Sequence, residues 1–296
     1  MGCCSSGGTK AASSAGGVPQ VGLPSQAPPA SAAIAKSQAQ PKAQSNDIVP
    51  SKLAQAAKTR VLALGSCELK SIPLDAFKLE ELKSVDLSVN KLSKLPDSIS
   101  GWGARLHTLN LGSNALASLP ESVGDLVGLK KLIISSNKLN ILPLALGKLT
   151  SLQELRASDN SVVELPDCFG SLDMLAEVDL AGNNLKGLPP SFFHLRGIQR
   201  LLLSRNKLEE IPPGLAGVKS LLFLDVADNC SISCVPPLLL KNTLIFDMRL
   251  QGNKIQRLAF RDTDGYAEFM ARRKGKIDQK LDAKMQHIDI GLCGLD

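Results

Sequence analysis

The first six residues, MGCCSS, carry the groups of this chain that are best suited to covalent chemistry. Gly2 and Ser6 fit the N-myristoylation pattern, in which removal of Met1 exposes the glycine amine to an acyl chain. One myristoyl chain binds a membrane only marginally, with a constant of about 10⁴ per molar, so a second signal is required. Cys3 and Cys4 are placed to supply it as S-palmitoylation sites. We therefore expect acylation of all three residues, with an accidental cysteine pair in a tail as the alternative.

Residues 1–50 are rich in Ala, Ser, Pro, Gly and Gln, and we interpret them as a flexible tether. They contain no hydrophobic signal core, and no apolar run in the chain approaches the roughly 20 residues of a membrane helix. The seven cysteines have no spacing typical of a disulfide framework. These features predict the cytoplasmic side of a membrane, with the plasma membrane as the expected one, or the cytosol if acylation does not occur.

From residue 59 onward the sequence repeats every 23 or 24 residues. Segments such as LHTLNLGSNALASLP (106–120) and LKKLIISSNKLNILP (129–143) fit the pattern LxxLxLxxNxLxxLP. One marker position recurs in nine copies, as Cys67, Asn90, Asn114, Asn137, Asn160, Asn183, Asn206, Asn229 and Asn253. Self-similarity at this period resembles the leucine-rich repeat.

The residues of the pattern indicate how each copy folds. LxL alternates between buried and exposed positions, which predicts a short strand. Such a strand cannot bury its leucines alone, so neighbouring copies must stack into a parallel sheet with a continuous core. The asparagine amide then satisfies backbone groups of adjacent turns, and LxxLP returns along the convex side. At Cys67 we expect a terminal copy that needs no amide, with a redox role as the alternative.

The same register explains two irregular features. Trp102 falls where other copies have an aliphatic residue, which predicts a core position rather than a ligand-stacking one. The eighth copy has one extra residue between Asn229 and Pro236, which predicts a bulge near Cys230 and Cys234. A zinc site there is the disfavoured alternative, because no second ligand pair lies nearby in the sequence.

Both ends of a solenoid need a cap. Residues 51–59 predict a short helix with Ser51 as its N-cap, and residues 263–296 predict a capping helix and tail. The domains expected are therefore the tether 1–50, the repeat domain with its cap 51–262, and the segment 263–296. The apolar stripe of the last helix is Tyr266, Phe269, Met270, Ile277, Leu281 and Met285. Its basic outer side, either solvated or facing a membrane, is Arg272, Arg273, Lys274, Lys276 and Lys280.

The end of the repeats, QGNKIQR followed by DGYAEFMARRKGK, looks like that of small cytosolic leucine-rich-repeat proteins such as leucine-rich-repeat-containing protein 57. The LP-type repeats also resemble plant intracellular Ras-group-related leucine-rich-repeat proteins. The resemblance implies an α/β fold, a leucine-rich-repeat solenoid with a curved parallel sheet of about nine repeats. It is also the sole basis for a small GTPase as a candidate partner.

Residues that flank the buried strand position face the concave side of such a solenoid. In the early copies they are small, whereas from the fourth copy onward they mix charges of both signs with apolar side chains, as in a protein interface. The alternative is that these charges only solvate the sheet and pair with one another. The predicted protein-binding residues are Ile133, Glu154, Arg156, Glu177, Asp179, Arg200, Leu202, Phe223, Asp225 and Arg249.

No catalytic motif was found, so we expect no enzyme activity, no catalytic residues, no cofactor and no metal. A single-sign basic stripe is absent, which argues against nucleic acid. We expect a monomeric, membrane-anchored scaffold or adaptor for a signalling protein, possible partners being a small GTPase or a phosphatase. The alternative is a soluble regulatory subunit of a phosphatase or small GTPase pathway. An extracellular recognition domain is the least favoured reading.

Overall fold

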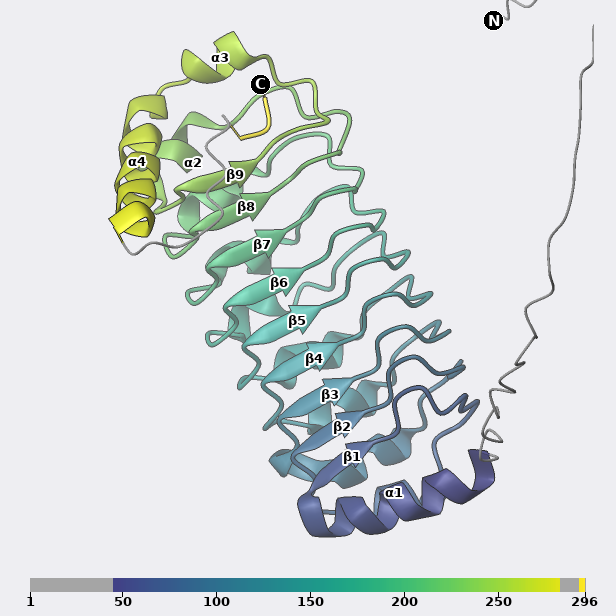
Figure 1. Cartoon of the computed structure of the whole chain (residues 1–296). Coiled ribbons are helices and arrows are strands. Elements are labelled where there is room, and N and C mark those ends of the chain that lie inside the picture. Colours follow the sequence, from purple (N-terminus) through teal and green to yellow (C-terminus); the bar gives the residue numbers. More distant parts are fainter. Residues whose placement is uncertain (1–44, 283–292, 296) are drawn as a thin grey trace, which may run out of the picture. The chain divides into compact units, whose positions relative to one another are not determined.

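The structure is a computed structural model that describes residues 45–282 and 293–295. The described residues belong to one compact unit, Ala43–Asp296, and form a parallel sheet whose nine strands follow one another in chain order (Figure 1). The strands are β1 Val61–Ala63, β2 Ser84–Asp86, β3 Thr108–Asn110, β4 Lys131–Ile133, β5 Glu154–Arg156, β6 Glu177–Asp179, β7 Arg200–Leu202, β8 Phe223–Asp225 and β9 Asp247–Arg249. The predicted α/β leucine-rich-repeat solenoid is confirmed.

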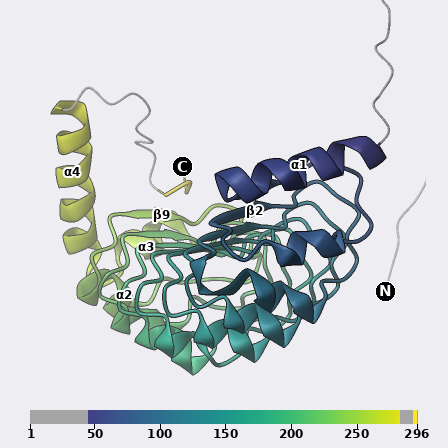
Figure 2. The ribbon, with the colours of Figure 1, turned by 90° about the horizontal axis from the view of Figure 1, so that it is seen from below.

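Short helices form the outer arc of this curved unit, and the strands form the inner one (Figure 2). The 3-10 helices are η1 Leu74–Lys78, η2 Asp97–Arg105, η3 Glu121–Asp125, η4 Leu144–Lys148, η5 Phe169–Ser171, η6 Pro190–His194 and η7 Pro213–Gly217. The α-helices are α1 Ser45–Thr59, α2 Pro237–Asn242, α3 Arg257–Arg261 and α4 Tyr266–Asp282.

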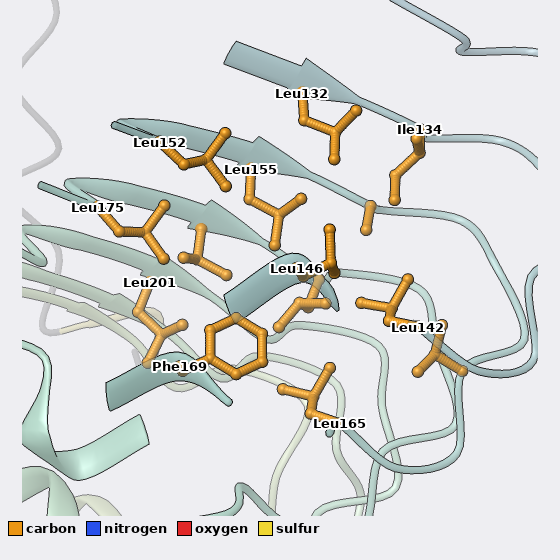
Figure 3. Close-up of a cluster of buried hydrophobic side chains, with 14 of the residues drawn as sticks. Leu132, Ile134, Leu142, Leu146, Leu152, Leu155, Leu165, Phe169, Leu175 and Leu201 are labelled. Atoms are coloured by element: carbon orange, nitrogen blue, oxygen red, sulfur yellow. The ribbon is translucent and has the colours of Figure 1, made fainter. Parts of the chain in front are cut away.

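The core is a continuous column of aliphatic side chains. Each strand buries its middle residue, such as Leu132 in β4 and Leu155 in β5, and in every strand but β8 the two flanking residues are at least partly exposed. Leucines of the LP turns, such as Leu142, and residues of the 3-10 helices, such as Leu146 and Phe169, close the column from the other side (Figure 3). Each repeat therefore needs its neighbours to exclude water.

The predicted asparagine ladder is confirmed. Asn137 shows the pattern: its Nδ2 donates to the carbonyls of Ile134 and of Leu111 in the preceding repeat, at 3.1 and 3.0 Å. Its Oδ1 accepts from the Leu116 amide at 3.0 Å. In the first copy, the Cys67 amide donates to Asn90 Oδ1 at 3.1 Å, and the thiol accepts from Lys52 Nζ of α1 at 3.3 Å. A terminal copy thus needs no asparagine of its own.

The residue before each marker adopts a left-handed backbone, which the sequence pattern did not reveal. These residues are Ser66, Val89, Ser113, Ser136, Asp159, Gly182, Arg205, Asp228 and Gly252. The turn that aims the asparagine inward requires this conformation, which costs a non-glycine residue roughly 1–2 kcal/mol. Val89, with φ of 54°, is the least suited of the set because its β-branched side chain crowds the backbone.

In the two copies of 24 residues, the extra residue is accommodated where one additional residue adopts a left-handed backbone conformation. Gly103, with φ of 62°, interrupts η2, and Cys230, with φ of 61°, forms the bulge that we predicted in the eighth copy. Trp102 is fully buried, stacks on Phe77 with ring centroids 5.3 Å apart, and donates from Nε1 to the Ala76 carbonyl at 2.9 Å. Its predicted core position is confirmed.

The N-terminal cap helix is longer than expected. α1 begins at Ser45 rather than Ser51, so Ser51 lies inside the helix and its predicted N-cap role is wrong. Val49 and Leu53, one helical turn apart, both pack against the core, which favours helix through the preceding residues.

The C-terminal cap helix corrects the predicted basic outer side. In α4 the first part of the apolar stripe packs inward as expected, with Phe269 buried and Tyr266 and Met270 against the core, whereas Ile277 is half-buried and does not join it. Arg273, however, is only 5% exposed and donates to Asp247 Oδ1 at 2.7 Å, and Arg272 donates to the Ile245 carbonyl at 3.0 Å. These two arginines bind the helix to the sheet instead of facing solvent or a membrane. The side chains of Lys280 and Leu281, and the whole of Met285, lie outside the described residues.

The far edge of the sheet is covered by a short segment near the end of the chain. The Leu250 amide donates to the Cys293 carbonyl at 2.9 Å. Leu111 and Leu87 make the equivalent bond to the following repeat, through the Ile133 and Asn110 carbonyls. Cys293 is buried in the core and Leu295 packs against it. Residues 293–295 thus take the place of a tenth repeat.

Substituting Val89→Asn should raise the free energy of unfolding by about 1 kcal/mol, because asparagine tolerates the left-handed backbone that valine resists. Val89 is 56% exposed, so little buried area is lost. Urea denaturation of the full chain measures the change. The control is Val163→Asn, an exposed valine outside the left-handed set; an equal gain in both variants would contradict the explanation.

Substituting Arg273→Gln should lower the free energy of unfolding by about 2 kcal/mol, because Asp247 loses a charged hydrogen bond at a buried site. Lys274→Gln removes the same charge from the exposed neighbour and should change stability little. Thermal melts measure the loss of stability in both variants. An equal loss would contradict the buried role of Arg273 and favour a position on the outer side of α4.

Candidate protein-binding face

The flanking residues of the nine strands form two rows across the concave face. Strand pairing places equivalent residues of successive repeats side by side, for example Glu154 beside Glu177 and Arg156 beside Asp179. All ten predicted binding residues occupy such flanking positions: Ile133, Glu154, Arg156, Glu177, Asp179, Arg200, Leu202, Phe223, Asp225 and Arg249. Their placement follows directly from the 23-residue period.

Ion pairs connect the charged residues from β4 to β7 except Asp179, which forms none with the described residues. Lys131 Nζ lies 2.8 Å from Glu154 Oε2, and Arg156 Nε contacts the other oxygen of the same carboxylate. Glu177 is shared between Arg156, at 3.6 Å, and Arg200, at 3.9 Å. The alternative that charges of the concave face pair with one another therefore agrees with the observed distances. Lys131 belongs to this chain of pairs although it was not among the predicted residues; its position 23 residues before Glu154 was the available signal.

Phe223 does not offer the exposed apolar surface that we expected. It is 6% exposed, because the guanidinium carbons of Arg200 and Arg249 lie 4.5 and 5.5 Å from its ring centroid. Both arginines come from neighbouring strands, so the ring is covered from β7 and from β9. Stacking of this kind holds a planar guanidinium in a fixed orientation.

Asp225 and Asp179 each accept a hydrogen bond from a backbone amide of the following loop. Asp225 Oδ1 accepts from the Ala227 amide at 3.0 Å, and Asp179 Oδ1 accepts from the Ala181 amide at 3.1 Å. This bond satisfies the amide where the strand ends. Asp225 is buried rather than exposed, which corrects our expectation, and burial raises the pKa of its carboxyl against the opposing effect of the Ala227 amide.

The accessible apolar surface of the strands is limited. Ile133 and Leu202 are half-buried among the charged residues, and Val61 is exposed at the first strand. The early strands carry small polar residues such as Ser84 and Thr108, as predicted. The distinctive part of the concave face is therefore the strip from β4 to β9, in which planar cations cover acidic and aromatic groups.

The predicted lipidation sites Gly2, Cys3 and Cys4 lie outside the described residues. Within residues 45–282 and 293–295, no helix combines the length and apolar character that crossing a bilayer would require.

Comparison with known proteins identifies the class. The leucine-rich repeat region model matches residues 42–162, and the leucine rich repeat model matches residues 173–230. Together they cover more than half of the chain, which belongs to the leucine-rich-repeat proteins. Domains of this class are protein–protein interaction scaffolds. The narrower likeness to leucine-rich-repeat-containing protein 57 and to the plant group stays a prediction.

Two curated relatives share a part of the repeat array. Ras guanine nucleotide exchange factor V of Dictyostelium discoideum is 35% identical over 89 residues, 26% of this chain and 4% of that protein. The volume-regulated anion channel subunit LRRC8A of Homo sapiens is 34% identical over 88 residues, 29% of this chain and 11% of that protein. The chain thus spans a small part of the length of either relative.

Solved structures agree on the fold. A leucine-rich-repeat protein of Leptospira interrogans is 26% identical with a TM-score of 0.55, over 75% of this chain and 58% of that one. The leucine-rich repeat domain of the type III effector XopL is 25% identical with a TM-score of 0.64, over 74% of this chain and 78% of that one.

Substituting Asp225→Asn should stabilise the protein at neutral pH. A raised pKa means that the folded protein holds this proton more tightly than the unfolded chain does, so ionisation costs stability as pH rises through that pKa. Asparagine keeps the acceptor for the Ala227 amide without the buried charge. Urea titrations from neutral to acidic pH should show the variant's advantage shrink as wild-type Asp225 becomes protonated. Asp179→Asn, at the equivalent but more exposed position, should differ less from wild type; equal shifts would contradict the role of burial.

Proposed function

We propose that this chain is a non-enzymatic scaffold that binds a signalling protein on its concave face while N-terminal acylation holds it at the cytoplasmic side of a membrane. The observation that carries the proposal is the strip from β4 to β9, where Ile133 and Leu202 lie among arginines held by ion pairs and ring stacking. Apolar side chains set among ordered charges favour a protein partner.

The membrane part of the proposal rests on the MGCCSS motif. Myristate at Gly2 and palmitate at Cys3 or Cys4 supply the two signals that stable anchoring needs. A small GTPase is the first candidate partner, on the family resemblance and on the repeat segment shared with a Ras guanine nucleotide exchange factor. The second candidate function is a soluble regulatory subunit of a phosphatase or small GTPase pathway, which would change the partner's turnover in solution.

Acylation is tested with the chain untagged at its N-terminus, expressed beside Gly2→Ala and Cys3→Ser/Cys4→Ser variants. Each is fed alkyne-myristate and alkyne-palmitate and then fractionated. Gly2→Ala should lose myristate, and the cysteine variant should keep myristate but lose palmitate and tight membrane association. A soluble, unlabelled wild type would remove the membrane from the proposal and leave a free binding solenoid.

Partner binding is tested by proximity labelling with Arg156→Ala/Arg200→Ala/Leu202→Ala, which strips accessible groups from the strip and leaves buried Phe223 and Asp225 intact. Selected partners should fall at least about tenfold, because groups of this kind dominate interfaces. The matched control, Lys148→Ala/Lys186→Ala/Arg196→Ala, removes residues outside the strands and should keep the partners. If both triple variants label the same set of partners, the assignment of the binding surface to the concave face is contradicted.

A further inference from the structure

On the concave face the positively charged side chains are more exposed than the carboxylates with which they pair. Its cations and carboxylates pair, yet in each pair from β4 to β9 that joins two strand residues the cation is the more exposed member. The Arg200 side chain is 50% exposed against 30% for Glu177, and that of Arg249 is 56% exposed against 6% for Asp225. Lys131 and Arg156 both cover the less exposed Glu154 in the same way. In these pairs a partner therefore meets the cation first, although the strand positions from β4 to β9 hold four cations and five carboxylates.

Arg200 and Arg249 are the most exposed of these cations, at 50% and 56%. Their carboxylate neighbours lie at 3.9 and 3.7 Å, beyond hydrogen-bond distance, and within the described residues neither guanidinium donates a hydrogen bond to a protein acceptor. Arg272 and Arg273 of α4, by contrast, are hydrogen-bonded. Since both guanidinium groups lie against the Phe223 ring and beside a carboxylate, their positions are set before any partner arrives.

A fixed, exposed guanidinium with open donors is suited to bidentate recognition of a carboxylate. Arg200 is the first residue of β7 and Arg249 the last of β9, so two strand spacings and an offset of two residues separate their backbones by about 12 Å. Their guanidinium groups converge on the Phe223 ring, at 4.5 and 5.5 Å from its centroid. Carboxylates at alternate positions of an extended segment recur about every 7 Å, so such a segment laid across the strands can reach both forks.

We propose that the strip from β4 to β9 selects an acidic partner segment, with Arg200 and Arg249, stacked on Phe223, as the two anchoring carboxylate receptors. The inference rests on the proposed function, because it names the chemistry of the partner at the same face. It commits to a protein segment rather than a lipid surface, since both arginines lie on the inner arc of the solenoid, where a flat bilayer does not follow the curvature (Figure 2).

The test uses the full chain and three fluorescent nonapeptides with Glu, Gln or Lys at alternate positions separated by Val. Anisotropy at low salt should show binding of the glutamate peptide only. Arg200→Gln/Arg249→Gln should weaken it at least about tenfold, the loss of one to two charged hydrogen bonds. Arg200→Lys/Arg249→Lys, which keeps the charge without the fork, should recover part of the binding. Thermal melts confirm that the variants are folded.

The matched control is Arg205→Gln, an equally exposed arginine in the loop after β7 that pairs with Asp159. Arg205→Gln should bind the glutamate peptide as wild type does. The proposal is overturned if this variant weakens binding as much as the double variant, or if the glutamine peptide binds equally well. It is also overturned if phosphatidylserine vesicles, and not the peptide, show the dependence on Arg200 and Arg249.

The outcomes separate this inference from the proposed function. Binding of the lysine or glutamine peptide that still depends on Arg200 and Arg249 would overturn selection of acidic segments and leave the concave face as a binding surface. Unchanged partners in the proximity-labelling experiment would instead remove the concave face itself from the proposed function.

Discussion

A strand of three residues points only its middle side chain into the core, so no repeat of this chain can form a core alone. The molecule depends on the contact between one repeat and the next, and the asparagine ladder is the polar part of that contact. Each amide binds the carbonyl of its own turn and of the preceding one, as Asn137 does with Ile134 and Leu111. Because buried backbone groups must be paired, this ladder fixes the stacking distance and hence the rows of side chains on the concave face.

The register of those rows could be predicted from the sequence because it depends only on the period. Once the markers are aligned, the flanking positions follow, and Glu154 beside Glu177 or Leu202 beside Asp225 required no further information. The bulge at Cys230 was predictable for the same reason, as one residue too many between two fixed points. The core position of Trp102 followed from its register with the aliphatic residues of other copies.

Exposure could not be predicted in this way, because it depends on which neighbour lies over a side chain. Phe223 has a surface position in the pattern, yet guanidinium groups from two adjacent strands cover it. Arg273 belongs to a basic run in the sequence, but helix α4 turns it toward Asp247. The left-handed residue before each marker was hidden because its chemical type varies from Gly182 to Val89. For Phe223 and Arg273, exposure is determined by residues that are distant in the sequence. For the residue before each marker, the conformation is determined by the backbone turn and not by the side-chain type.

The two ends of the sheet are closed by unlike devices, helix α1 before β1 and residues 293–295 beyond β9. An array of identical repeats has no intrinsic reason to stop, and an uncovered last strand could accept the first strand of another copy and grow into a filament. The Cys293 carbonyl occupies the Leu250 amide that such growth would use. A segment of three residues therefore sets the length of the array and opposes polymerisation of the chain.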